Sequence, residues 1–205
     1  MRGLFDVCVA HSLSCFLVSR RCGFTELQLG RVLGRGGFCV VSEVTKIHLD
    51  KGDVEQLDVG KSDDENFIYS VVQDRGFMAR HCIRKGKDCR YAVKRVQDSV
   101  KKDPQTYISA VVDLAVETRF LSVIRHPNII KMRAMFNEDH FSPGFFIVLD
   151  RLYDIMPFRL KKWKKQKGGA MKKIFQGKKS HAFWSERMTV AYDIAHALSY
   201  MHGLK

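Results

Sequence analysis

A glycine cluster near the N-terminus has residue types that could bind phosphate groups. Gly34-Arg35-Gly36-Gly37-Phe38 lies between two apolar segments rich in β-branched residues, 27–33 and 39–44, which predicts two antiparallel strands joined by a glycine turn. Glycines let backbone N–H groups approach an anion without obstruction by side chains. Taken alone the pattern is weak, because any tight hairpin can contain several glycines. A phosphate site also needs a fixed cation nearby.

Lys94 is the candidate cation. It interrupts an apolar segment, 91–96, whose composition predicts a short strand. A charge between Val93 and Val96 is unusual in such a strand. The alternative interpretation is an edge-strand lysine that points into solvent.

Glu117 is the candidate partner of this lysine. It lies in a segment, 109–124, that predicts a helix, with Leu114 and Phe120 three residues before and after it. A carboxylate among apolar side chains is costly unless it meets a positive charge. We therefore expect Glu117 to pair with Lys94 and to hold its ammonium group towards bound phosphates. The alternative is a partly exposed glutamate at the edge of the apolar face.

The elements that must position these residues predict an α+β fold. Segments 129–136 and 145–149 are typical of strands, Pro157 of the first turn of a helix, and 185–202 of a helix with Ser185 as its N-cap. We expect an antiparallel sheet of about five strands with one packed helix, followed by a helical segment.

The charge of the chain is unevenly distributed. Its 205 residues have a net charge of +13, and 159–179 contains many basic residues and no acidic one. We interpret 159–179 first as a basic, solvated surface loop. The functional alternatives are binding to nucleic acid, to anionic lipid or to an acidic partner. Nucleic acid has the least support, because only Trp163 and Phe175 could stack on bases. An acidic stretch, 50–74, is interpreted as a loop insertion.

Composition and cysteine spacing exclude several classes of protein. A content of 45% hydrophobic and 28% charged residues is ordinary for a globular chain, and no apolar run is long enough to span a membrane. The six cysteines form no C-x-x-C pair, so zinc and thioredoxin-type sites are not predicted, and we expect reduced thiols. Asp6 and His11 interrupt the signal-like N-terminus. We expect a cytoplasmic protein, with a nuclear location as the alternative.

In order and spacing, these segments resemble the small lobe of a eukaryotic protein kinase. The matching segments are 33–41 for the nucleotide-covering loop, 91–94 for the strand with the phosphate-binding lysine, Glu117 for the helix glutamate, 126–129 for the loop after that helix, and 145–152 for the last small-lobe strand and the hinge. The resemblance implies an N-terminal extension at 1–26 and a small lobe at 27–150 with an acidic loop inserted at about 47–89. An incomplete large lobe would follow at 151–205, containing the hinge exit, the basic loop and the first helices.

The resemblance implies that ATP binds to the chain. The residues that it places around ATP are Leu33, Gly34, Arg35, Gly36, Gly37, Phe38, Val41, Ala92, Lys94, Leu149, Asp150 and Leu152. Lys94 would hold the α- and β-phosphates, Glu117 would position Lys94, and Leu149 would be the gatekeeper. Cys39 stands where the family has a third glycine.

The resemblance also implies a limit on activity. The sequence ends at Lys205, before the positions at which the family's catalytic loop and the Asp-Phe-Gly ligand of Mg²⁺ follow. We expect a full-length form to transfer the γ-phosphoryl group of ATP to a protein substrate, at Ser or Thr rather than Tyr, and the 205 residues alone to be inactive. The alternatives are a non-catalytic nucleotide-binding or scaffold protein, and a basic module that binds nucleic acid through 159–179.

Overall fold

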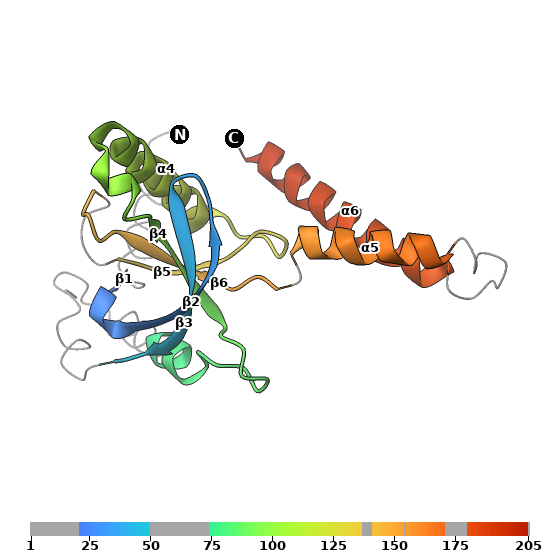
Figure 1. Ribbon diagram of the computed structural model, residues 1–205, viewed down its shortest axis with the longest axis horizontal. Coiled ribbons are helices and arrows are strands. Elements are labelled where there is room, and N and C mark those ends of the chain that lie inside the picture. The colour runs from blue at the N-terminus through green and yellow to red at the C-terminus, as the bar shows by residue number, and fades with distance from the viewer. Residues whose placement is uncertain (1–20, 50–73, 137–140, 154, 171–179, 205) are drawn as a thin grey trace, which may run out of the picture. The chain divides into compact units, whose positions relative to one another are not determined.

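The computed structural model describes residues 21–49, 74–136, 141–153, 155–170 and 180–204 (Figure 1). The chain forms two compact units. The first contains the described residues before Arg125 together with Ile130–Arg151, and the second contains Arg125–Ile129 and the described residues from Leu152 onward.

The first unit is built around one sheet. Its strands are β1 (Arg21–Cys22), β2 (Leu27–Arg35), β3 (Cys39–Ile47), β4 (Tyr91–Val96), β5 (Met132–Phe136) and β6 (Phe146–Asp150), in the spatial order β1-β5-β6-β4-β3-β2. All neighbours pair antiparallel except β1, which is parallel to β5. The predicted α+β class and the predicted antiparallel sheet are confirmed. The short β1 and the 3-10 turn η1 (Phe24–Glu26) add structure at 21–26, which was predicted as an extension outside the lobe.

One long helix, α4 (Pro104–Val123), belongs to this unit, preceded by a 3-10 turn, η2 (Val100–Lys102). The carboxylate of Asp103 caps its N-terminus by accepting from Thr106 N–H, and Pro104 occupies the first turn, where no N–H is needed. Its buried residues include Leu114 and Leu121. The sequence predicts Phe120 beside Leu114 on the apolar face around Glu117, but the side chain of Phe120 is 58% exposed.

The two faces of the sheet are covered by different elements. The register aligns Val41 with Lys94 and Ile147, and Glu43 with Ala92 and Leu149. Because strand side chains alternate, these two rows share one face, which is the face of Lys94 and α4. Tyr91 lies on the opposite face, where it lines a cavity together with Phe77 and Met78.

The insertion between β3 and β4 is more than a loop in its described part. Residues 74–80 are helical, and Figure 1 shows this helix and α4 on opposite sides of the sheet. Arg75 of this helix is buried and forms an ion pair with Glu26, and the Cys82 thiol donates to Val44 O. The loop predicted over 47–89 is therefore corrected for 74–80, which form a helix that packs on the sheet, whereas 81–89 are turns with one isolated bridge between Ile83 and Cys89. The acidic part of the insertion lies almost wholly outside the described residues.

The second unit contains two helices, α5 (Met156–Ala170) and α6 (Ser180–Gly203). The prediction of a basic loop over 159–179 is wrong for 159–170, which belong to α5. The Lys, Arg, Leu and Gln residues of this segment are good helix formers. Residues 171–179 lie outside the described residues. The predicted helix over 185–202 is present but begins earlier, so Ser185 is an interior residue and not the N-cap. Within the described residues, neither helix combines the length and the apolar character needed to cross a membrane.

Candidate functional site

The glycine cluster forms the turn of the β2–β3 hairpin. Gly34 pairs with Val41 and Arg35 with Val40, and Gly36 N–H donates to Cys39 O at 2.8 Å. The side chains of Leu33 and Phe38 are partly exposed at this end of the hairpin. The predicted strand–glycine turn–strand unit is therefore present, with the glycines at its tip.

The three glycines of this turn are not required by the packing of the chain. A Cβ atom would meet no heavy atom within 4 Å at Gly34 or Gly37, and at Gly36 the nearest atom would be Cys39 O at 3.8 Å. None of the three has a left-handed backbone. Gly30 is different, because a Cβ there would lie 2.7 Å from Glu43 Cγ and from Thr45 Cγ2. The open space beside the turn glycines is the space that a ligand would need to reach their backbone N–H groups.

Gln97 holds this turn against the end of β4, which the sequence reasoning missed. Its Nε2 donates to Gly36 O at 2.7 Å and to Gly37 O at 3.4 Å, and its backbone N–H donates to Phe38 O at 2.9 Å. Arg35 Nη1 donates to Gln97 Oε1 at 3.3 Å. The turn is therefore fixed to the strand that carries Lys94. The only sequence signal for the role of Gln97 is its position, three residues after Lys94.

The predicted ion pair is present between the sheet and α4. Lys94 Nζ donates to Glu117 Oε2, and the two side chains keep 25% and 34% of their surface exposed. Lys94 pairs in register with Val41 of the glycine hairpin, so its ammonium group lies on the hairpin's own sheet face. Glu117 thus fixes a cation on this face while leaving it accessible to an anion.

The apolar residues predicted around an adenine share this face of the sheet. Ala92 and Leu149 are directly opposite one another and are buried, and Val41 is half-buried one row away. Cys39 is also half-buried, and burial raises the pKa of its thiol. Val41, Ala92 and Leu149 thus lie on the same sheet face as Lys94, and apolar side chains beside a fixed cation are the combination that an adenine joined to phosphates requires.

The structure limits which groups of the predicted hinge could contact a ligand. Asp150 N–H donates to Lys131 O and Arg151 N–H to Arg90 O, so both are used within the chain. The carboxylate of Asp150 accepts from Arg133 at 2.7 and 2.8 Å, which raises the pKa of Arg133. Asp150 could therefore offer a ligand only its carbonyl group. Leu152, the last predicted contact, is exposed and is the first residue of the second unit after Arg151.

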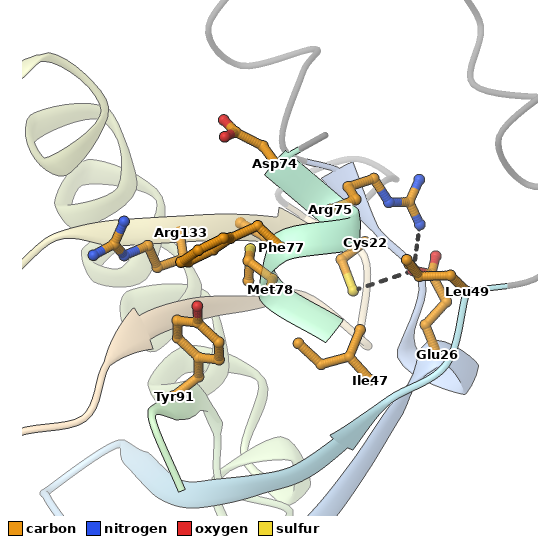
Figure 2. Close-up of a pocket in the computed structure, with 11 residues that line it drawn as sticks. Cys22, Glu26, Ile47, Leu49, Asp74, Arg75, Phe77, Met78, Tyr91 and Arg133 are labelled. Atoms are coloured by element: carbon orange, nitrogen blue, oxygen red, sulfur yellow. Dashed lines mark hydrogen bonds and ion pairs between the residues drawn. The ribbon is translucent and has the colours of Figure 1, made fainter. Parts of the chain in front are cut away.

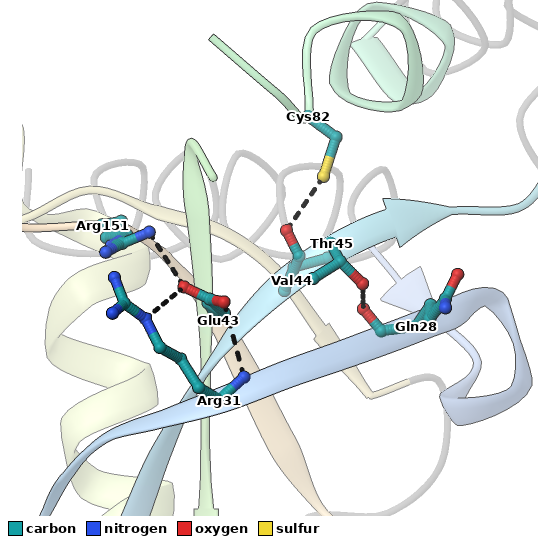
Figure 3. A network of polar contacts seen from close by, with 7 residues as sticks. All are labelled: Gln28, Arg31, Glu43, Val44, Thr45, Cys82 and Arg151. Atoms are coloured by element: carbon teal, nitrogen blue, oxygen red, sulfur yellow. Dashed lines mark hydrogen bonds and ion pairs between the residues drawn. The ribbon is translucent and has the colours of Figure 1, made fainter. Parts of the chain in front are cut away.

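A charged network links β2, β3 and the end of β6 (Figure 3). Glu43 Oε2 accepts from Arg151 Nη1 at 3.0 Å and from Arg31 Nε at 3.2 Å. Glu43 belongs to the same row of the sheet as Ala92 and Leu149. The network therefore attaches the glycine hairpin to the residue that follows β6.

A cavity of about 70 Å³ lies on the opposite face of the sheet. Figure 2 shows Tyr91 and Arg133 from the sheet and Phe77 and Met78 from the helical segment lining it. Cys22 also lines it, and burial raises the pKa of its thiol. None of the predicted site residues lines this cavity, so it is not the candidate site.

The described part of the chain contains no group of three or more His, Cys, Asp or Glu side chains that could hold a metal ion. The four cysteines of this part, Cys22, Cys39, Cys82 and Cys89, form no disulfide with one another. The site is thus a glycine turn, one fixed cation and an apolar surface.

Comparison with known proteins adds no assignment. No protein-family model matches the chain, and no curated protein matches it.

Proposed function

We propose that the first unit binds ATP in the manner of a protein kinase small lobe. The observation that carries the proposal is the Lys94–Glu117 ion pair on the same sheet face as the glycine hairpin. A lysine held by a carboxylate is oriented, and it can bind phosphate oxygens by charge-assisted hydrogen bonds.

The residues of the hairpin and the sheet fit such a ligand. The backbone of Gly34, Gly36 and Gly37 would cover the phosphates, and the open space beside these glycines supports that role. Val41, Ala92 and Leu149 would contact the adenine. Leu33, Arg35 and Phe38 would lie at the rim, and the carbonyl of Asp150 would complete the set at the end of β6.

For a full-length form we propose transfer of the γ-phosphoryl group to Ser or Thr of a protein substrate. Bound Mg²⁺ would neutralise charge on the phosphates. For the 205 residues we propose nucleotide binding. A non-catalytic nucleotide-binding or scaffold role is the alternative for the full-length form.

The test is titration of the chain with ATP by calorimetry, comparing wild type with Lys94→Met. Loss of one hydrogen bond to a charged group, about 1.5–3 kcal/mol, predicts affinity lower by roughly 10- to 150-fold. Lys46→Met is the matched control, because Lys46 is an exposed lysine of β3 in the same sheet. Circular dichroism establishes that both variants fold. Equal ATP affinity in wild type and Lys94→Met, or no ATP binding by the wild type, would overturn the proposal.

A further inference from the structure

The exposed surface of α5 combines lysines with one large apolar side chain. Phe158, Lys161, Lys162 and Lys165 have the 3- and 4-residue spacing of one helical face, and together they line one hollow of the surface. The side chain of Phe158 is 61% exposed, and all three lysines are exposed. The face therefore presents an aromatic ring surrounded by positive charge.

Two other side chains of α5 make contacts within the second unit. Trp163 is buried, with the guanidinium of Arg187 5.1 Å from its ring centre. Arg159 lies 3.9 Å from Glu186 of α6, and Lys162 of the exposed face lies at the same distance from the same carboxylate. Among the described residues, the structure records no acidic partner for Lys161, Lys164 or Lys165. These charges are therefore free to meet an external anion.

The chemistry of this face favours an anionic membrane surface over nucleic acid. Lysines act as point charges towards a diffuse anionic surface, whereas the planar recognition of single phosphates and bases is typical of arginine. With Trp163 buried, Phe158 is the one aromatic side chain of the described α5 that could stack on a base. Ile155 is also exposed, in the turn that precedes Phe158. Exposed apolar side chains beside a lysine face are the pattern of a helix lying in a membrane interface.

We propose that α5 docks the second unit on a membrane surface rich in anionic phospholipid. Lys161, Lys162 and Lys165, with Lys164 at the margin, would lie at the level of the headgroups. Phe158 would insert among the upper acyl chains. This proposal rests on the second unit alone and is independent of ATP binding by the first.

The experiment is co-sedimentation of the full chain with unilamellar vesicles of phosphatidylcholine, with and without about 30 mol% phosphatidylserine. We expect binding only to the anionic vesicles, and release at high salt. Each lysine near such a surface contributes about fivefold in affinity, so Lys161→Gln/Lys165→Gln should lower partitioning roughly 25-fold. The matched control is Lys85→Gln/Lys131→Gln, which removes the same charge from exposed lysines of the first unit and should leave partitioning unchanged.

Phe158→Ala separates the apolar contribution from the charge. It should weaken binding several-fold at low and at moderate salt alike, because burial of a ring is not screened by ions. Equal partitioning of wild type and the Lys161/Lys165 variant would overturn the proposal. So would tighter binding to a single-stranded oligouridylate than to anionic vesicles, lost in the same variant, since that result would assign the face to nucleic acid.

Discussion

Replacing Arg151 with methionine should destabilise the first unit much more than the same replacement of Arg31. Both guanidinium groups bind the same carboxylate oxygen of Glu43, at 3.0 and 3.2 Å. Their surroundings differ, because the side chain of Arg151 is 8% exposed, that of Glu43 14% and that of Arg31 69%. The pair thus compares a buried and an exposed ionic contact made to one acceptor.

The burial of each arginine sets the expected loss of stability. An exposed ion pair contributes about 0.2–1 kcal/mol to the free energy of unfolding, which is the expected loss for Arg31→Met. Breaking a buried pair costs about 3–5 kcal/mol, and because Glu43 would keep Arg31, we expect about 2–3 kcal/mol for Arg151→Met. The double variant Arg151→Met/Glu43→Leu should recover much of this loss, since it leaves no buried charge without a partner.

The assay is urea unfolding followed by far-ultraviolet circular dichroism. With a slope of about 2–3 kcal/mol per molar urea, Arg151→Met should lower the unfolding midpoint by roughly 1 M and Arg31→Met by no more than about 0.5 M. Tryptophan fluorescence gives a separate record of the second unit, because Trp163 and Trp184 both belong to it. Equal midpoint shifts for the two variants would refute the argument that burial of Arg151 decides the energy of this network.

Two further predictions concern the glycine turn and the buried thiols. Gln97→Ala removes the bonds to Gly36 O and Gly37 O. One neutral hydrogen bond is worth about 1 kcal/mol, so the change should lower the urea midpoint by about 0.3–0.5 M and ATP affinity by up to roughly fivefold. Unchanged affinity in the same calorimetric titration would show that the turn is held by other contacts. Burial raises the pKa of Cys82 to about 11 and also raises that of Cys22, so the folded chain holds these protons more tightly than the unfolded chain. The contribution of these thiols to stability should be fully present below about pH 9 and be lost as pH rises towards 11, as measured by urea midpoints at successive pH values from about 8 upward, and Cys82→Ala should make the fall shallower.

The strands and the central ion pair could be predicted because their signals are local. The strand at 91–96 coincides with β4, and the pairing of Lys94 with Glu117 followed from two charges placed in apolar segments. Such placement is informative, since an unpaired charge among apolar side chains would be strongly unfavourable. Glu43 gave the same kind of signal within an apolar strand, and the same argument would have predicted a cationic partner for it.

The failures have a common physical origin in long-range contacts. Phe120 was placed on the buried face of α4, but the helix is apolar on more than one side, so periodicity alone does not select the face that packs. The contacts of Gln97 and Arg151 depend on the pairing of β4 with β3 and β6, which a single sequence does not reveal. The helix at 74–80 lies in a polar insertion whose few apolar residues become meaningful only against the sheet.

The contacts that escaped prediction have a consequence for the proposed site. Gln97 fixes the tip of the β2–β3 hairpin to the end of β4, and Glu43 fixes its body to Arg151. The hairpin is therefore held at two points, and Lys94 lies on β4, the strand that pairs with β3 of the hairpin. A ligand that entered would meet donors already in place and would not need to order a free loop, which reduces the entropic cost of binding. Both Gln97→Ala and Arg151→Met should consequently lower the affinity for ATP by loosening the hairpin, although neither side chain is proposed to touch the nucleotide.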